Sequence, residues 1–271
     1  MSTVKNPDIP QTQQVKQCCA SLYESDVARL LLGESFHPGG LKLTERLAQL
    51  LGLGPGDRVL DVASGKGASA MFMAERFGCE VIGIDYGQHN VEQASAEAAE
   101  RRLDHLVRFQ QADAESLPFP DRTFDAVVCE CAFCTFPDKS RAAHEFARVL
   151  RDGGRAGLSD LTRSSELPKE LQGLFAWVAC IADAMPMEQY LQHLNAAGLC
   201  DGKTESHDEA LIEMVRQIQG KLLGAEIMAG LKKFDASGFD FPAARQMAKA
   251  ALAAIERGQL GYALMVAFTH R

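Results

Sequence analysis

Among the residues of this sequence, the eight cysteines have the widest choice of chemistry. Cys129, Cys131 and Cys134 fall within six positions of one segment, CECAFCTF. Thiols at this spacing can bind zinc, form a disulfide, pack as small hydrophobic groups or hold a thiophilic substrate. A structural zinc site needs four ligands in a compact unit, which C-x-C-x-x-C running out of a strand does not offer. We therefore predict no metal site and favour a thiol-lined acceptor site, mostly through Cys131 or Cys134, with core packing or a redox disulfide as alternatives.

Further cysteines lie in two segments that could approach the same site. Cys18 and Cys19 are in the N-terminal segment, close to Tyr23, and Cys180 is in the helical pattern AWVACIADAMP. Each can pack as a small hydrophobe instead, which is the main alternative for Cys180.

A second group of chemistry-bearing residues begins in VLDVASGKG. Gly65 and Gly67 allow a sharp turn that brings backbone amides close to a ligand. The Asp61 carboxylate, at the end of the preceding strand, repels a pyrophosphate but can hold the ammonium of an amino-acid ligand. Asp85 follows about 18 residues after Gly67, where an acid can bind both ribose hydroxyls. Asp113 comes after the next strand and can approach an adenine amino group.

Short apolar runs alternate with helical patterns around these motifs. Five of these runs are interpreted as strands: RVLDV, CEVIGIDY, VRFQQ, FDAVVCECAFCTF and RAGLSDLT. The last segment, GYALMVAFTHR, is interpreted as a final antiparallel strand. Strand–helix alternation at this spacing predicts a parallel sheet with helices on both faces. Ligands of such sheets bind at the carboxyl ends of the strands. The glycine turn and CECAFCTF are therefore expected to meet at one edge.

Composition excludes several classes of partner. The chain has 271 residues, a net charge of −8 and a pI of about 5.4, which argues against nucleic acid. It has no apolar run of the roughly 18–20 residues that span a bilayer, so we expect no membrane partner. The N-terminal segment lacks the apolar core of a signal peptide. We therefore expect a cytoplasmic protein whose thiols stay reduced.

VLDVASGKG, VIGIDY, QQADAESLPFPDRTFDAVVC and ARVLRDGG resemble the successive motifs of class I S-adenosylmethionine-dependent methyltransferases. The resemblance covers roughly residues 40–200 and the last strand. It implies an α/β, Rossmann-like fold with strand order 3-2-1-4-5-7-6, S-adenosylmethionine as cofactor and a small-molecule acceptor. The cofactor-binding residues that it implies are Asp61, Ala63, Gly65, Gly67, Asp85, Tyr86, Asp113, Ala114, Glu115 and Tyr23. Ala63 stands where the family often has glycine, a mild departure because alanine is small.

VVCECAFCTFPDK and AWVACIADAMPMEQYLQHLNAAGL are similar, more specifically, to the arsenite methyltransferase branch. That branch binds trivalent arsenic through thiolates, and Cys180 matches its lid-helix cysteine. This chain has Ala68 and Ser69 where the branch usually has a further cysteine, and it lacks the branch's C-terminal cysteines. The resemblance implies methyl transfer to arsenite or a related metalloid. Cys131, Cys134, Cys18 and Cys19 are then the other candidate ligands.

Two other functions remain open. An S-methyltransferase for sulfide, methanethiol or another small thiol needs a compact, mostly apolar pocket with few charges and no strong base. A non-catalytic protein could bind S-adenosylmethionine or sense a metalloid with the same thiols. An oxygen acceptor would need a base. The candidates for that base are His37 in SFHPGG, His89, Glu130 and Asp160.

The predicted organisation has four parts. Residues 1–40 form an N-terminal arm and cap, and residues 41–207 form the cofactor-binding core with a lid helix at 164–185. Residues 208–258 form a helical insertion, and residues 259–271 form the last core strand. The insertion is longer than the core requires, so it is a candidate second lid or homodimer interface.

Overall fold

A computed structural model describes residues 37–171, 180–181, 183–230 and 239–270. Its centre is a seven-stranded sheet in the order β3-β2-β1-β4-β5-β7-β6, in which β7 alone runs antiparallel to its neighbours. This confirms the predicted Rossmann-like class I methyltransferase sheet. The strands are β1 (Arg58–Val62), β2 (Glu80–Asp85), β3 (Val107–Gln111), β4 (Phe124–Glu130), β5 (Leu150–Arg163), β6 (Leu199–Ser206) and β7 (Leu260–Thr269).

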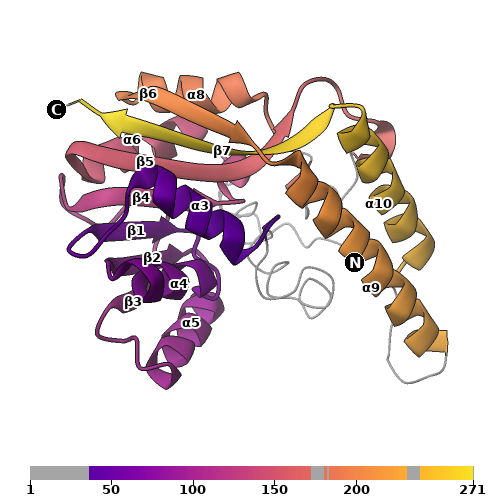
Figure 1. Cartoon of the computed structure of the whole chain (residues 1–271), viewed down its shortest axis with the longest axis horizontal. Coiled ribbons are helices and arrows are strands. Elements are labelled where there is room, and N and C mark those ends of the chain that lie inside the picture. Colours follow the sequence, from indigo (N-terminus) through magenta and orange to yellow (C-terminus); the bar gives the residue numbers. More distant parts are fainter. Residues whose placement is uncertain (1–36, 172–179, 182, 231–238, 271) are drawn as a thin grey trace, which may run out of the picture.

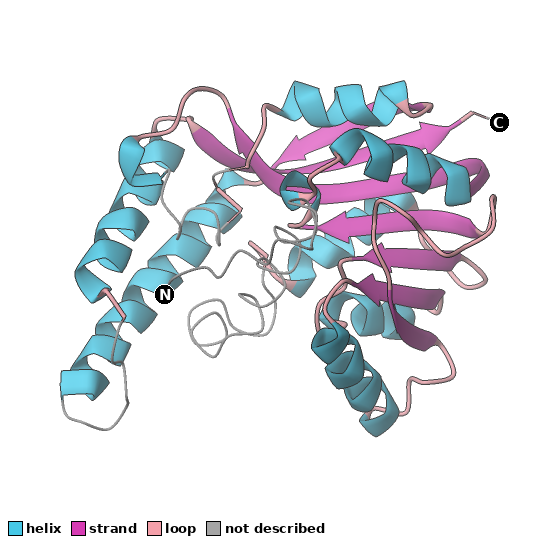
Figure 2. Ribbon diagram, turned by 180° about the vertical axis from the view of Figure 1, so that it is seen from behind, coloured by secondary structure: helices cyan, strands magenta, loops and turns pink. Residues whose placement is uncertain are grey.

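Helices cover both faces of this sheet (Figures 1 and 2). The described helices are α3 (Leu41–Leu51), α4 (Ala68–Phe77), α5 (Gln88–Glu100), α6 (Lys139–Val149), α8 (Met187–Ala196), α9 (Asp208–Gly230) and α10 (Phe241–Glu256). Two short 3-10 turns, η1 (Phe133–Thr135) and η2 (Lys169–Leu171), connect them to the strands. Polar caps start some of these helices: the Asp138 carboxylate accepts from the Arg141 amide at α6, and Asp240 precedes Pro242 at α10.

Alternation along the central strands divides the core into two apolar clusters. Val59 and Val128 face a cluster formed with α3 and α4. Leu60, Val127 and Cys129 face the opposite cluster, which includes residues of α6, α8 and α10. Because successive strand residues point to opposite faces, Glu130 projects toward the α3 and α4 side, away from Cys129.

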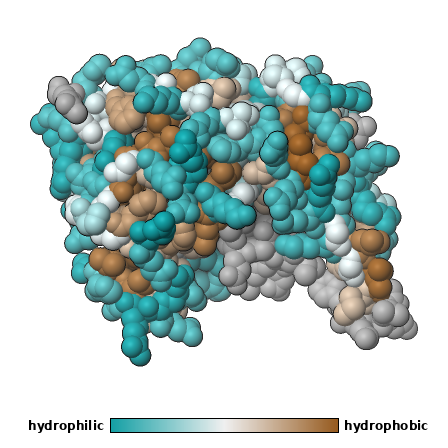
Figure 3. All heavy atoms as spheres, viewed as in Figure 1, coloured by the Kyte–Doolittle hydropathy of each residue, from teal (hydrophilic) through white to brown (hydrophobic). Residues whose placement is uncertain are grey.

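Helices α9 and α10 pack against each other and form an arm beside the start of β7 (Figure 1). Buried residues on both helices, including Leu211, Val215 and Ala248, belong to the main core cluster. At the far end of α9, Leu223, Ile227 and Met228 are exposed, and Figure 3 shows an apolar patch there. The arm is thus an integral part of the core at one end and open to solvent at the other.

Strand β5 begins earlier than the sequence indicated. The segment RAGLSDLT, which begins at Arg155, was interpreted as this strand, but α6 ends at Val149 and β5 starts at Leu150. Leu150 pairs with Phe124, and after a register shift Arg155 pairs with Ala126, so the intervening glycines bulge out of the ladder. Of the expected lid helix 164–185, the 3-10 turn η2 is described, whereas residues 172–179 and 182 lie outside the described residues.

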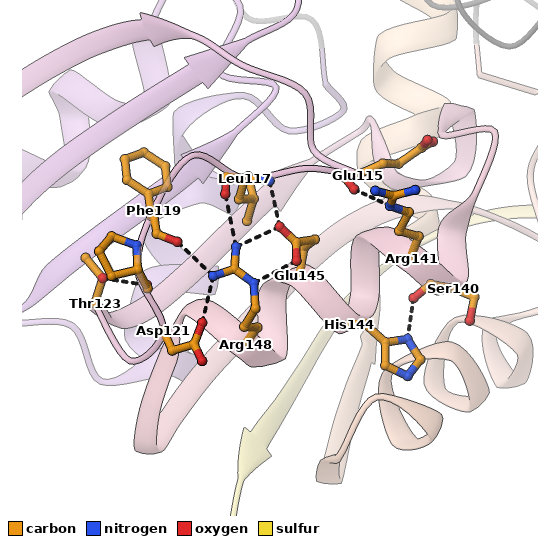
Figure 4. Close-up of polar contacts among 11 residues, drawn as sticks. Glu115, Leu117, Phe119, Asp121, Thr123, Ser140, Arg141, His144, Glu145 and Arg148 are labelled. Atoms are coloured by element: carbon orange, nitrogen blue, oxygen red, sulfur yellow. Dashed lines mark hydrogen bonds and ion pairs between the residues drawn. The ribbon is translucent and has the colours of Figure 1, made fainter.

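An arginine of α6 fixes the loop between β3 and β4 (Figure 4). The Arg148 guanidinium donates to the carbonyls of Leu117 and Phe119 and pairs with Asp121. The Glu145 carboxylate, which also pairs with Arg148, accepts from the Leu117 amide. This network holds the segment that follows Asp113 and so fixes one end of the site described next.

Within the described residues, no helix has both the length and the apolar character needed to span a membrane.

Candidate active site

The turn after β1 has the geometry of a ligand-binding loop. Gly65 and Gly67 have φ values of +53° and +78°, in the left-handed region that favours glycine. A Cβ atom on Gly67 would lie 2.3 Å from Cζ of Phe109, so this position excludes any side chain. The Gly65 amide donates to Asp85 Oδ2 at 2.9 Å, which ties the turn to the end of β2.

A cavity of about 180 Å³ lies at the carboxyl ends of β1, β2 and β4. Its wall is formed by His37, Asp61, Val62, Ala63, Ser64, Gly65, Lys66, Ala68, Ser69, Ile84, Asp85, Tyr86, Asn90, Ala112, Asp113, Ala114, Glu130, Cys131, Ala132, Thr135, Phe136 and Pro137. The parallel strands end at this edge, which is where ligands of open α/β sheets bind.

Two aspartates of the wall are buried in different ways. Asp61 is 2% exposed and its Oδ2 atom has no hydrogen-bond partner. Its pKa is raised well above the usual value by burial, and further by the charges of Glu130 and Asp85. The Asp85 Oδ1 atom accepts from the Gly87 amide and from Asn90, but burial still raises the pKa of Asp85. The unpartnered Asp61 oxygen fits a cationic ligand group.

Glu130, at the end of β4, is held by donors from three other elements. Its Oε2 atom accepts from Ser69 at 2.6 Å and from Thr44 at 3.0 Å, and lies 3.5 Å from Nε2 of His37. Ser159 lies 3.4 Å from the other carboxylate oxygen and accepts from the Tyr262 hydroxyl. The cavity wall therefore contains a histidine and a carboxylate in contact with each other.

Three of the predicted acceptor cysteines come together beside the cavity. Cys131 is in the cavity wall, whereas Cys134 and Cys180 are buried directly behind it. The Cys180 thiol donates to the Cys131 carbonyl at 3.4 Å, and the Cys134 thiol lies 3.8 Å from the Cys180 carbonyl. Segments 46 to 49 residues apart in the chain thus bring their thiols to one place.

Two thiols of this cluster, those of Cys131 and Cys134, have raised pKa values. The pKa of Cys131 is raised well above its usual value by a hydrogen bond with Cys180 and by burial. Burial, followed by a hydrogen bond with Cys180, does the same to Cys134. The buried carboxylate of Asp160 accepts from the Cys134 and Leu161 amides, and burial raises its pKa to about 7. Within the described residues, no group of three His, Cys, Asp or Glu side chains is arranged to hold a metal ion.

Most of the predicted site residues lie in the cavity wall. These are His37, Asp61, Ala63, Gly65, Asp85, Tyr86, Asp113, Ala114 and Cys131. Gly67 shapes the turn without lining the cavity. Glu115 lies outside the wall, where its carboxylate accepts from the Asp138 amide. Cys18, Cys19 and Tyr23 lie outside the described residues.

The sequence reasoning missed Thr44, Ser69 and Asn90, which orient the Glu130 and Asp85 carboxylates. Ser69 was noted as the residue in place of a family cysteine, and its hydroxyl proves to be the closest donor to Glu130. Ser69, a polar residue in the first turn of α4, was the feature of the sequence that could have indicated this contact.

Comparison with known proteins places this geometry in a family. Residues 60–158 match the methyltransferase domain family. The chain is 34% identical over 197 residues to 27-O-demethylrifamycin SV methyltransferase of Amycolatopsis mediterranei, covering 65% of this chain and 70% of that protein. The chain belongs to the class I S-adenosylmethionine-dependent methyltransferases. This methyltransferase therefore uses S-adenosylmethionine as its cofactor.

Solved structures show the same fold. The [4+2]-cyclase SpnF superposes with a TM-score of 0.76 at 26% identity, covering 96% of this methyltransferase and 97% of SpnF. Phosphoethanolamine N-methyltransferase 2 of Haemonchus contortus, solved with S-adenosylmethionine, has a TM-score of 0.80 at 18% identity. The match covers 95% of this methyltransferase and 60% of the Haemonchus chain, and at that identity it shows the fold alone.

Proposed function

We propose that this methyltransferase transfers the methyl group to a small thiophilic acceptor, with arsenite or a related metalloid as the preferred class. The observation that carries the proposal is the convergence of Cys131, Cys134 and Cys180 at the carboxyl end of β4, beside the cavity. Thiols are soft ligands, and a group of them beside a methyl-transfer cavity suits an acceptor that binds sulfur.

The same proposal includes the residues that would contact the cofactor. The unpartnered oxygen of Asp61 would hold the α-ammonium of S-adenosylmethionine, and Asp85 would hold the ribose hydroxyls. Asp113 and Ala114 lie in the wall beyond Asp85, where the adenine would bind. When bound, this cofactor would supply a sulfonium methyl group, whose carbon an acceptor lone pair would attack in line while S-adenosylhomocysteine leaves as the neutral thioether.

The raised thiol pKa values are compatible with capture of arsenite. Arsenite at neutral pH is As(OH)₃, and each thiol that binds it forms one As–S bond while one As–O bond breaks. The departing hydroxide takes the thiol proton and leaves as water, so no free thiolate and no net proton release are required. A thiol acting as a free nucleophile would instead need a lowered pKa. To bind one arsenic atom together, the three side chains would rotate toward the cavity.

The cavity wall argues against the small-thiol alternative. A site for sulfide or methanethiol was expected to contain few charged groups. The wall instead contains Asp61, Glu130 and the His37 imidazole around a small volume. These polar groups can form hydrogen bonds with a neutral metalloid hydroxide, and they depart from the mostly apolar wall expected for a small-thiol site.

A hydroxyl acceptor is the second candidate, because His37 is a buried imidazole in the cavity wall, 3.5 Å from Glu130. A histidine paired with a carboxylate can remove a proton from an attacking hydroxyl. The name of the Amycolatopsis relative refers to methylation at an oxygen.

The test is an acceptor screen on the purified full chain with S-adenosylmethionine. Arsenite with glutathione should give methylated arsenicals by liquid chromatography and mass spectrometry, with S-adenosylhomocysteine formed in equal amount. Sulfide and methanethiol, assayed by headspace gas chromatography, should give little methyl sulfide. Production of S-adenosylhomocysteine with any acceptor eliminates the non-catalytic alternative.

A pair of cysteine variants then tests the thiol cluster. Cys180→Ser should reduce arsenite methylation at least tenfold, whereas Cys200→Ser, on the partly exposed thiol of β6, should leave it unchanged. If Cys180→Ser retains wild-type arsenite methylation, the metalloid site is wrong. If His37→Ala removes activity toward an oxygen acceptor and arsenite is inert, the second candidate replaces the first.

A further inference from the structure

Glu130 is a buried carboxylate with mostly neutral partners. Its side chain is 5% exposed, and its hydrogen-bond donors are the hydroxyls of Thr44, Ser69 and Ser159. Nε2 of His37 lies 3.5 Å from Oε2 of Glu130 and forms an ion pair with it only when the imidazole is protonated. None of the ion pairs recorded for the described residues joins Glu130 to a lysine or an arginine. The carboxylate is therefore held mainly by hydroxyl donors, without a permanently charged partner among them.

The charge of Glu130 adds to a group of carboxylates. Asp61 and Asp85 share the cavity wall with it, and both Glu130 and Asp85 act on Asp61 strongly enough to raise its pKa. Burying like charges together is costly unless a cation neutralises them. One cation, the α-ammonium of the cofactor, accounts for the unpartnered oxygen of Asp61. Glu130 requires a separate explanation.

The strand order places Glu130 at a particular end of the cofactor site. Asp113 follows β3, Asp85 ends β2 and Asp61 is in β1, so these three acids follow the sheet from its edge toward its centre. Glu130 ends β4, the next strand in this order, and is followed directly by Cys131 in the cavity wall. With adenine and ribose bound toward β3 and β2, as proposed above, the end of β4 would face the sulfur end of the cofactor.

We propose that Glu130 recognises the positive charge at the cofactor sulfur and so favours the methylated sulfonium over the neutral thioether product. S-Adenosylmethionine carries a sulfonium, and S-adenosylhomocysteine does not, whereas both carry the α-ammonium that Asp61 would hold. Glu130 thus distinguishes the substrate cofactor from the spent cofactor, which it does not hold by charge. The hydroxyls of Thr44 and Ser69 position its carboxylate for this role. The inference rests on S-adenosylmethionine as the cofactor and on the cofactor contacts proposed above. It does not depend on the identity of the methyl acceptor.

The test measures ligand affinity by isothermal titration calorimetry on the full chain without any acceptor. The ligands are S-adenosylmethionine, S-adenosylhomocysteine and sinefungin, a close analogue with a protonated amine in place of the sulfonium. Glu130→Gln keeps the shape and removes the charge. It should weaken binding of S-adenosylmethionine and sinefungin about tenfold, equivalent to about 1.4 kcal/mol, and that of S-adenosylhomocysteine less than twofold.

Thr44→Val is the matched comparison, because it removes one hydrogen bond to Glu130 and keeps the charge. It should change the ratio of affinities for sinefungin and S-adenosylhomocysteine much less than Glu130→Gln does. Equal weakening of all three ligands by Glu130→Gln, or no weakening, would overturn the inference. Should that variant fail to fold, the affinities of the wild-type protein still test the inference. If the wild type binds S-adenosylhomocysteine as tightly as sinefungin, charge recognition is contradicted. None of these results depends on whether arsenite is the acceptor.

Discussion

At the scale of single residues, backbone strain concentrates at the site. In the described part of the chain six residues other than glycine have positive φ, and three of them are Ala63, Cys131 and Cys180. Such conformations cost about 1–3 kcal/mol each and persist where the surrounding structure enforces them. From the sequence, alanine at position 63 was expected to replace the family's glycine with little effect, because alanine is small. Its φ of +58° shows that the family's glycine preference there concerns conformation as well.

The two glycines of the turn should respond differently to alanine. Gly67→Ala combines positive φ with a collision against Phe109, whereas a Cβ atom at Gly65 meets nothing within 4 Å. Urea unfolding should show a loss of about 1 kcal/mol for Gly65→Ala, from strain alone. Gly67→Ala should lose roughly 2–4 kcal/mol because clash adds to strain, and calorimetry should show cofactor binding reduced at least tenfold. Similar losses in both variants would contradict the packing described for Gly67.

At the scale of elements, the sequence predicted which strand ends form the site but not which helices complete it. The carboxyl ends of parallel strands meet at one edge, so the positions of Asp61, Asp85 and Glu130 followed from the pattern alone. The contacts of Glu130 with Thr44 and Ser69 join residues 86 and 61 positions apart. No local pattern encodes such contacts, since they depend on how α3 and α4 pack on the sheet.

The buried end of β5 should make stability depend on pH. The pKa of Asp160 is about 7 in the folded protein and about 4 when unfolded. Between these values the folded state binds more protons, so the free energy of unfolding should fall as pH rises from 4 to 7. The slope from this one group is at most about 1.4 kcal/mol per pH unit. Asp61 and Asp85, whose pKa values are also raised, contribute in the same direction.

Urea unfolding between pH 4.5 and 7.5 measures this slope. Asp160→Asn should flatten it, while an offset of about 1–3 kcal/mol arises because an amide cannot accept from both the Cys134 and Leu161 amides. Asp152→Asn, on an exposed aspartate paired with Arg122, is the control and should leave the slope unchanged. An unaltered slope in Asp160→Asn would show that this carboxyl is ionised throughout the range.

At the scale of the whole molecule, the order of the sequence motifs was sufficient to predict the family and the strand order of the sheet. It was insufficient to predict the methyl acceptor. The cofactor motifs lie on strand ends that the fold fixes, whereas the thiols beside the cavity come from the residues after β4 and from Cys180. The predicted helical insertion corresponds to α9 and α10, whose inner residues are part of the main core. Its roles as lid or dimer interface, like the four-part division of the chain, stay predictions.

Cofactor binding should stabilise the entire protein, because it neutralises carboxylates that are buried together in the free form. Binding to the folded state at 100 times Kd contributes about 2.7 kcal/mol, which for a domain of this size corresponds to a rise in Tm of about 5–10 °C. Asp61→Asn should raise the Tm of the free protein at neutral pH, since it removes a carboxyl whose ionisation is opposed by burial and by the neighbouring carboxylates. The same variant should lose most of the cofactor-induced shift. Differential scanning fluorimetry with and without S-adenosylmethionine measures both effects, and a full shift in Asp61→Asn would place the ammonium elsewhere in the cavity.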